Sequence, residues 1–424
     1  MKKLYLIMIS ILVMVCFAGV ISVSYAIEEV KIGAIYPLTG AMSANGSECM
    51  RGIELAAELV NNKFEGIDLP LTETEGLPNL GGAKIKLIVI DDEGSPEKAL
   101  NAAERLISQN VVAMIGCYQS SCASTASQAA ERQQIPFVGP DVTSPTLTER
   151  GFKWFFRTTP TDVVFSEAFY TFLDELKEKK GKEEGKDIKR IAILCEDSLT
   201  GTDQIEIATR IAEERGYEVV AKITFATGTA DLSSEVQKLK ASKPDVLFTG
   251  IYVSDLILFI KTAKELDFNV DLVFDASGIA DNTEIFTTLK KDTDFDIGYA
   301  AWALDLAGKK PVVGVVNKMY KDKYGADMTE LTARSFTGAY VLFMAINNAG
   351  STENVAIQKA LQNLNLSNDQ LIMPWPGVQF DEKGQNFKAT PLLLQAKDMA
   401  LNVIWPFNFA SMEVVWPRPK WSDR

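Results

Sequence analysis

The sequence contains no histidine in its 424 residues, and this absence excludes several kinds of site. Without an imidazole the chain cannot form a Ser-His-Asp or Cys-His nucleophile, a histidine general base or a histidine-ligated zinc site. An enzyme of this sequence would need a Ser-Lys pair or carboxylates instead. The candidate binding loops described below contain no lysine, so we expect a protein that is not an enzyme.

Nucleotide-binding motifs are also absent. The sequence has neither GxGxxG nor GxxxxGK[ST], the glycine-rich patterns that hold dinucleotides and phosphates. Acidic residues outnumber basic ones by 56 to 43, which gives a formal net charge of −13. Because an acidic body repels phosphate backbones and anionic membranes, we expect no nucleic-acid partner. Since the nucleotide motifs and histidine are absent, we also expect no bound cofactor and no metal.

Long apolar runs are absent beyond the N-terminus. Residues 1–26 have a basic start, an apolar run from Leu4 to Val23 and a small-residue end at Ser24-Tyr25-Ala26. This is the layout of a secretory signal peptide, so we expect cleavage near Ala26 and a soluble, exported, periplasmic protein. An uncleaved anchor is the alternative, because the run is about long enough to cross a bilayer.

Cysteine is scarce, and only four of the five cysteines lie beyond residue 26. Four thiols in a chain of this length do not make a disulfide framework. A bridge from Cys49 to Cys117 or to Cys122 stays open at this point. Cys195 ends an apolar run and is expected to be a buried thiol.

The chain does contain a repeated alternation of strand-like apolar runs and amphipathic helical stripes. Ser95-Pro96 marks one helix start, with a capping serine and a proline in the first turn. Runs that are apolar on both faces and joined by helices predict parallel sheets covered on both sides. The length favours two domains, so we predict an α/β fold with two such units. The runs are 30–36, 84–90, 111–115 and 136–138 in the first unit, and 191–194, 219–225, 246–251 and 272–274 in the second.

Ligands of open parallel sheets collect beyond the carboxyl ends of the strands. The segments expected there are rich in hydroxyls and turn residues. Ser120 and Ser121 stand just before a predicted helix, where their hydroxyls and the free N–H groups of the first turn suit a carboxylate. A plain serine cap is the alternative. The acid pairs Asp91-Asp92 and Glu196-Asp197 are better explained as structural, because adjacent strand residues point to opposite faces.

Several of these segments, in this order, resemble the type I periplasmic solute-binding proteins of ABC importers. The resemblance is to the branched-chain amino acid and amide group, which includes the leucine/isoleucine/valine-binding protein, and it covers nearly all of the mature chain. The resembling segments are VKIGAIYPLTG, IDDEGSPEKALNAAERLI, AMIGCYQSSCASTASQAAERQQIPFVGPDVTSPTLTERGFKWFFRTTPTD, PGVQFDEKGQ and VIWP.

The resemblance implies two Rossmann-like lobes joined by a hinge that the chain crosses three times, near Thr161, Ala301 and Phe387. Lobe one would hold residues 27–161 and 301–387, and lobe two residues 162–300 and 388–424. A ligand that bridges both lobes would stabilise the closed form through its extra contacts there.

The resemblance also implies a set of ligand-binding residues. Ser120 matches the serine that holds the ligand carboxylate, while Thr143 and Asp141 stand where the family binds both charged ends. Tyr252 matches the tyrosine that closes over the ligand from lobe two. The family's acidic partner for a ligand ammonium falls on Ser277, which is a departure.

Further positions differ from the family pattern. Asp141, Asp275 or Asp255 would have to replace the missing acid, and we favour Asp141. Asn45 stands where an aromatic commonly lines the pocket, and Trp302 or Tyr118 would supply an aromatic wall, although either ring is equally explained as core between the lobes. If no acid replaces the ammonium partner, an amide or a small carboxylic or aromatic acid is expected in place of an amino acid.

The function implied is capture of a small solute and its delivery to an ABC permease and its ATPase subunits, by a protein expected to be a monomer. The alternative is a sensor of the same fold that reports its ligand to a signalling partner. Export without a fused output domain favours transport.

Overall fold

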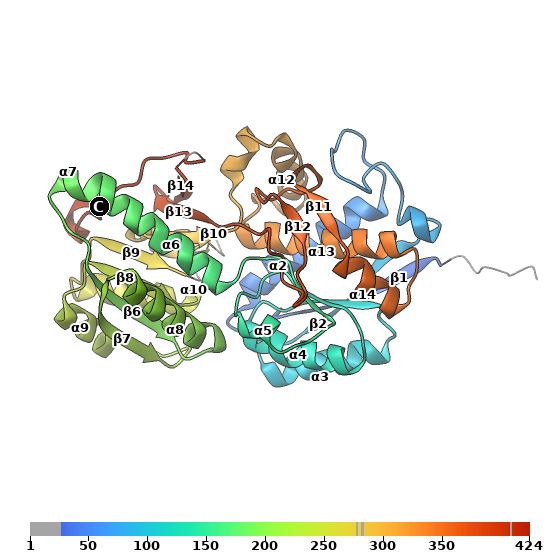
Figure 1. Cartoon of the computed structure of the whole chain (residues 1–424), viewed down its shortest axis with the longest axis horizontal. Helices are drawn as coiled ribbons and strands as arrows, with labels where there is room; N and C mark the ends of the chain where they lie inside the picture. Colours follow the sequence, from blue (N-terminus) through green and yellow to red (C-terminus); the bar gives the residue numbers. More distant parts are fainter. Residues whose placement is uncertain (1–26, 277–278, 281–283, 408) are drawn as a thin grey trace, which may run out of the picture.

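The computed structural model describes residues 27–276, 279–280, 284–407 and 409–424. It shows two α/β halves side by side along the long axis of the molecule (Figure 1). Residues 1–26 and Ser277 lie outside the described residues, so the signal peptide and the ligand-binding position predicted there stay predictions.

The first half is built on a five-stranded sheet in the order β2-β1-β3-β4-β5, in which every pairing is parallel. We call this sheet, with the helices that pack on it, lobe one. Its strands are β1 (Glu29–Tyr36), β2 (Lys84–Asp91), β3 (Ala113–Gly116), β4 (Phe137–Gly139) and β5 (Phe155–Arg157). Its helices include α2 (Ser43–Asn61), α3 (Pro96–Ser108), α4 (Ser120–Arg132), α5 (Thr146–Glu149) and α13 (Glu330–Ala349).

The second half, lobe two, is built on a seven-stranded sheet in the order β14-β13-β10-β9-β8-β6-β7. Its parallel strands are β6 (Arg190–Glu196), β7 (Glu218–Phe225), β8 (Val246–Gly250), β9 (Leu272–Asp275) and β10 (Ile297–Ala300). Two antiparallel strands, β13 (Leu392–Lys397) and β14 (Ala400–Trp405), extend it. The helices are α6 (Asp162–Leu176), α7 (Lys182–Glu184), α8 (Leu199–Glu214), α9 (Ser233–Ser242), α10 (Val253–Glu265) and α11 (Glu284–Leu289).

The chain passes between the two sheets three times. It leaves the first sheet after β5, returns toward lobe one after β10, and enters the second sheet again at β13. The segment between β10 and β13 contains α12 (Pro311–Tyr324), α13, α14 (Asn354–Gln362) and a small antiparallel pair, β11 (Asn365–Ser367) with β12 (Gly377–Gln379). The two-unit α/β fold predicted from the sequence is confirmed, while the residue limits of the lobes stay a prediction.

The antiparallel edge of the second sheet was not foreseen. Asp398 and Met399 connect β13 to β14, and both have positive φ, 51° and 62°. Such turns twist with the strands of a hairpin, but their usual marker is Asn or Gly at these positions. Asp followed by Met is a weak turn signal, so the sequence does not predict this hairpin.

The predicted start of α3 is confirmed. Ser95 is the N-cap, and its hydroxyl accepts a hydrogen bond from the backbone N–H of Lys98 at 3.4 Å. Pro96 occupies the first turn, where its missing N–H costs nothing.

Helix α13 is almost entirely buried in lobe one and packs closely on α2. A Cβ atom on Gly52 would lie 2.4 Å from the carbonyl oxygen of Thr332, so only glycine allows this approach. Gly338 plays the same part on another face, since a Cβ there would lie 2.5 Å from Pro140. The close approach fixes the N-terminal end of α13 against the loop that follows β4.

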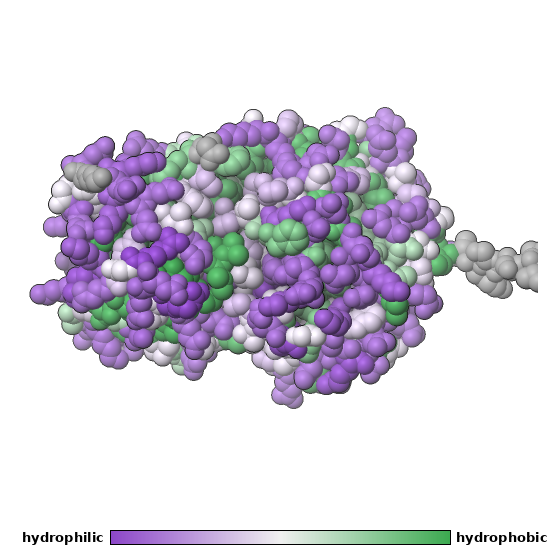
Figure 2. Space-filling model, in the orientation of Figure 1, coloured by the Kyte–Doolittle hydropathy of each residue, from purple (hydrophilic) through white to green (hydrophobic). Residues whose placement is uncertain are grey.

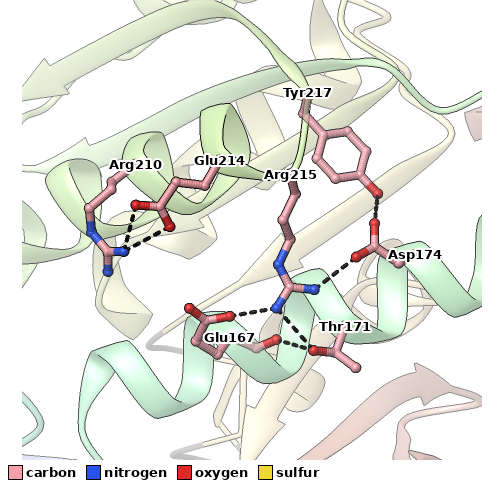
Figure 3. A network of polar contacts seen from close by, with 7 residues as sticks. All are labelled: Glu167, Thr171, Asp174, Arg210, Glu214, Arg215 and Tyr217. Carbon is pink, nitrogen blue, oxygen red and sulfur yellow. Dashed lines mark hydrogen bonds and ion pairs between the residues drawn. The ribbon is translucent and has the colours of Figure 1, made fainter.

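In lobe two, Arg215 joins the end of α8 to α6 (Figure 3). Its guanidinium donates to Asp174 at 2.8 Å and to Glu167 at 2.5 Å, both on α6. The Tyr217 hydroxyl donates to the other oxygen of Asp174 at 2.6 Å. The network ties the helix that follows the first passage between the sheets to the body of lobe two.

The face of the molecule seen in Figure 2 is mostly hydrophilic, with scattered apolar patches. Within the described ranges, no helix combines the length and apolarity that a membrane span requires. The structure records Cys49, Cys117, Cys122 and Cys195 as buried thiols outside any disulfide. The bridge left open by the sequence is therefore not formed.

Candidate functional site

A small cavity lies where the carboxyl ends of strands from the two parallel sheets come together, the place where open α/β sheets bind ligands. Its volume is about 20 Å³, roughly the space of one water molecule. The lining comes from both lobes and consists of Tyr118, Ser120, Asp141, Thr143, Thr200, Tyr252, Tyr299 and Arg334. We call this the cleft cavity.

Ser120 contributes from lobe one as the first residue of α4, which follows β3. The N-cap position is taken by Gln119, whose side chain makes no capping hydrogen bond. Ser120 is buried, and its hydroxyl accepts a hydrogen bond from the N–H of Ser144 at 3.4 Å. The plain serine-cap alternative is therefore not what the structure shows. Ser121 is half-buried on the same helix and does not line the cavity.

The loop after β4 contributes Asp141 and Thr143, as predicted, and both are buried. One oxygen of Asp141 accepts hydrogen bonds from the hydroxyls of Tyr36 at 2.8 Å and Ser335 at 2.7 Å. The carbonyl of Thr143 accepts from the N–H of Asp162 at 2.9 Å. Burial raises the pKa of Asp162 to about 7, against a hydrogen bond from Thr143 that lowers it.

Arg334 is a lining residue that the sequence analysis missed. It lies near the N-terminal end of α13 and is 2% exposed. Its Nε lies 3.0 Å from Glu330 Oε2 and 3.8 Å from Asp141 Oδ1. The other oxygen of Glu330 accepts from the N–H of Ala301, just after β10. A chain of contacts thus runs from the cavity to the second passage between the sheets.

Lobe two contributes Tyr252, the N-cap residue of α10, whose backbone N–H donates to Glu196 at 3.3 Å. Burial raises the pKa of Glu196 to about 8, and the nearby charges of Asp255 and Asp275 raise it further, against the Tyr252 hydrogen bond. Burial, and then the Glu196 charge, also raise the pKa of Tyr252. The phenol therefore stays protonated and able to donate a hydrogen bond near neutral pH.

Aromatic rings close the cavity. The Tyr118 and Tyr252 rings approach to 5.6 Å between centroids. Tyr299, on β10, stacks against Phe165 at 3.6 Å and was not foreseen. Asn45 is behind this wall, where its side-chain N–H donates to the Tyr118 hydroxyl at 3.2 Å. Tyr118 is thus an aromatic wall of the cavity, while Asn45 orients it.

Trp302 lies beside a different cavity, next to the second passage between the sheets. That cavity has a volume of about 190 Å³ and is mainly apolar, with Phe286, Met328 and Leu401 among its walls. The indole is 1% exposed, and its N–H has no partner among the described residues. The predicted aromatic wall at Trp302 is therefore separate from the cleft cavity.

Direct contacts between the lobes lie next to the cleft cavity. The Ser144 hydroxyl of lobe one donates to Asp203 on α8. The Thr146 hydroxyl, also of lobe one, lies 3.4 Å from the same carboxylate. These contacts are made only while the lobes are close together. Among the described residues no group of three carboxylates or thiols is placed to hold a metal ion.

A polar cavity between two α/β lobes, with a hinge of three chain passages, defines the class of two-lobed binding proteins. The family model described as periplasmic binding protein matches residues 29–398. The chain belongs to this family, and it is a substrate-binding protein rather than an enzyme.

Three relatives illustrate the similarity. Leu/Ile/Val-binding protein homolog 7 of Brucella abortus is 27% identical over 398 residues, which are 93% of this chain and 95% of the relative. The leucine-binding protein LivK of Thermotoga maritima has a TM-score of 0.74 at 22% identity, covering 88% of this chain and 97% of that one. A solute-binding protein of R. palustris in complex with benzoate has a TM-score of 0.72 at 16% identity, covering 89% and 95%.

Proposed function

We propose that this chain is the extracytoplasmic substrate-binding protein of an ABC importer and captures one small solute in the cleft cavity. The observation that carries the proposal is the lining itself, which combines hydroxyls from both lobes with one guanidinium and one carboxylate. A solute held there contacts both lobes and therefore favours the closed form.

Three of the predicted residues that line the cleft cavity would contact the ligand directly. Ser120 and the first-turn N–H groups of α4 suit a carboxylate or carbonyl oxygen of the ligand. Thr143 supplies a hydroxyl from the same lobe, and Tyr252 covers the ligand from lobe two. The solute classes are an amino acid, an amide or a small carboxylic or aromatic acid. The leucine-binding and benzoate-bound relatives support this range.

Delivery of the solute to a permease depends on the difference between the open and the closed form of the protein. A membrane permease that recognises the closed form would receive only loaded protein, and ATP hydrolysis by its partner subunits would drive import. Residues 1–26 would direct export to the periplasm and be removed. We further propose that lobe one comprises residues 27–161 and 301–387, and lobe two residues 162–300 and 388–424, in a monomer.

A thermal-shift screen tests the binding function. The mature protein, refolded after removal of bound solutes, is heated with amino acids, amides, urea, and aliphatic and aromatic acids. A solute that binds only the folded state raises the melting temperature by mass action, by an amount that grows with its concentration. Saturable one-to-one binding of at least one solute in calorimetry is the expected result. No stabilisation by any member of the panel would contradict the proposal.

A further inference from the structure

Arg334 is the one cation among the eight residues that line the cleft cavity. Arg334 is buried, and the other polar groups of the lining are six hydroxyls and the carboxylate of Asp141. Burying a guanidinium is costly unless it is paired. Its position at the cavity therefore calls for an explanation beyond packing.

Two carboxylates of lobe one hold Arg334 in place. Glu330, one helical turn earlier, lies 3.0 Å from the Nε atom of Arg334, and Asp141 lies 3.8 Å from the same atom. Each carboxylate is in turn held by protein donors, Glu330 by the N–H of Ala301 and Asp141 by the hydroxyls of Tyr36 and Ser335. The guanidinium is thus oriented before any ligand arrives.

The same contacts argue against Asp141 as the receptor of a ligand ammonium. Its Oδ2 already accepts two short hydroxyl hydrogen bonds, and its Oδ1 faces Arg334. An ammonium placed beside it would also lie close to the guanidinium and be repelled. The arrangement fits Asp141 better as the group that positions Arg334.

Around Arg334 the cavity offers donors suited to an anion. Ser120, Thr143 and Tyr252 carry hydroxyls, and the N-terminal end of α4 adds backbone N–H groups. A guanidinium presents a planar fork of N–H donors that matches a carboxylate in two parallel hydrogen bonds. A neutral amide matches this fork less well, because its NH₂ group is a donor facing donors.

Resting on the solute-binding function proposed above, we propose that Arg334 selects solutes that carry a carboxylate and contacts that carboxylate in the closed cleft. The carboxylate is then the essential group of the ligand, and an amine is not. Neutral amides and urea are excluded as the main ligands.

Matched pairs of probes test the selection. Benzoate with benzamide, L-leucine with L-leucinamide, and 4-methylpentanoate with its amide differ mainly in the carboxylate, and calorimetry measures each dissociation constant. For wild-type protein we expect the carboxylate of at least one pair to bind at least about tenfold more tightly than its amide. Arg334→Gln should reduce that ratio to near one.

Variants separate binding from folding. Arg334→Gln leaves two buried carboxylates without their cation, so the double variant with Glu330→Gln restores the local charge balance if the single variant does not fold. Arg334→Lys keeps the charge but loses the fork, and should keep part of the preference. Arg150→Gln removes a half-buried arginine of lobe one that does not line the cavity, and should leave the ratio unchanged.

The outcomes are distinct. A protein that binds only amides, or an Arg334→Gln variant that folds and retains the full carboxylate preference, would overturn the assignment of Arg334 while solute binding stands. A protein that binds neither member of any pair would overturn the carboxylate class. If it also fails to bind every other solute of the panel, the proposed function falls with it.

Discussion

The rings of Tyr118 and Tyr252 face each other across the cleft, with their centroids 5.6 Å apart. Tyr118 follows β3 in lobe one, and Tyr252 begins α10 in lobe two. With about 20 Å³ left in the cavity, a solute larger than a water molecule fits only if the residues that line it move apart. The closing of the lobes thus brings the two rings together and also brings both lobes into contact with the ligand.

Thr143→Ala and Tyr252→Ala should each weaken binding of the solute identified by the thermal-shift screen. Each removes a hydroxyl from the cavity lining, and loss of one buried hydrogen bond costs about 1–3 kcal/mol, or roughly tenfold to a hundredfold in affinity. Calorimetry measures the affinity, and circular dichroism checks that the fold is kept. Thr224→Ala, an exposed threonine on β7, is the control. Wild-type affinity in both cavity variants would place the ligand elsewhere.

Asp203→Ala should make closure less favourable. Its carboxylate accepts hydrogen bonds across the lobe boundary from Ser144 and Thr146, and these exist only when the lobes meet. Losing them should lower ligand affinity by about twofold to tenfold, since closure and binding are coupled. Glu206→Ala makes the same change of charge at an exposed position of the same helix. Equal affinities in the two variants would show that the contact does not stabilise the closed form.

The raised pKa of Glu196 should make the free energy of unfolding depend on pH. Its pKa is about 8 in the folded protein, mainly through burial, against an ordinary value of 4.5. The folded state therefore keeps a proton that the unfolded state has released, so stability falls as pH rises from about 4.5 to about 8.

Glu196→Gln should remove this part of the pH dependence. Between about pH 5 and pH 9 the wild type should lose a few kcal/mol more unfolding free energy than the variant, measured with urea at each pH. Asp162, whose pKa is about 7, titrates in both proteins, so its contribution largely cancels in the comparison. Parallel pH curves for the two proteins would contradict the burial of an ionisable Glu196.

Arg215→Ala should destabilise lobe two without changing ligand affinity. Its half-buried guanidinium makes two ion pairs to α6 (Figure 3), and their loss should cost about 1–2 kcal/mol. Arg210→Ala breaks an exposed pair with Glu214, one turn apart on α8, and should cost less than about 0.5 kcal/mol. Urea unfolding measures both. Similar losses in the two variants would mean that the Arg215 network adds nothing beyond a surface pair.

The sequence predicts most of the parallel framework, because long apolar runs and helix starts leave local signals. Ser95-Pro96 is one, confirmed as the start of α3. The predicted loop residues Ser120, Asp141, Thr143, Tyr118 and Tyr252 also come together at one cavity, although their part in binding stays a proposal. Their position follows from the rule that strand ends of a parallel sheet share one edge.

Arg334 could not be placed in this way, because it comes from a helix distant in sequence from those loops. The signal present in the sequence is a Glu330–Arg334 pair at i, i+4 in a helix with no other charged residue. Such a pair commonly marks an exposed helix face, whereas here both side chains are buried. Only the packing of α13 against the loop after β4 shows that this pair is buried and not on an exposed helix face.

Small-angle X-ray scattering of the mature protein, with and without the tightest-binding solute of the screen, tests most directly whether the protein closes around a solute. We expect a smaller radius of gyration at saturation, with a midpoint equal to the calorimetric dissociation constant. Asp203→Ala should need more solute to reach the same compact form. A scattering curve that stays unchanged while calorimetry reports saturation would contradict capture by closure of the cleft.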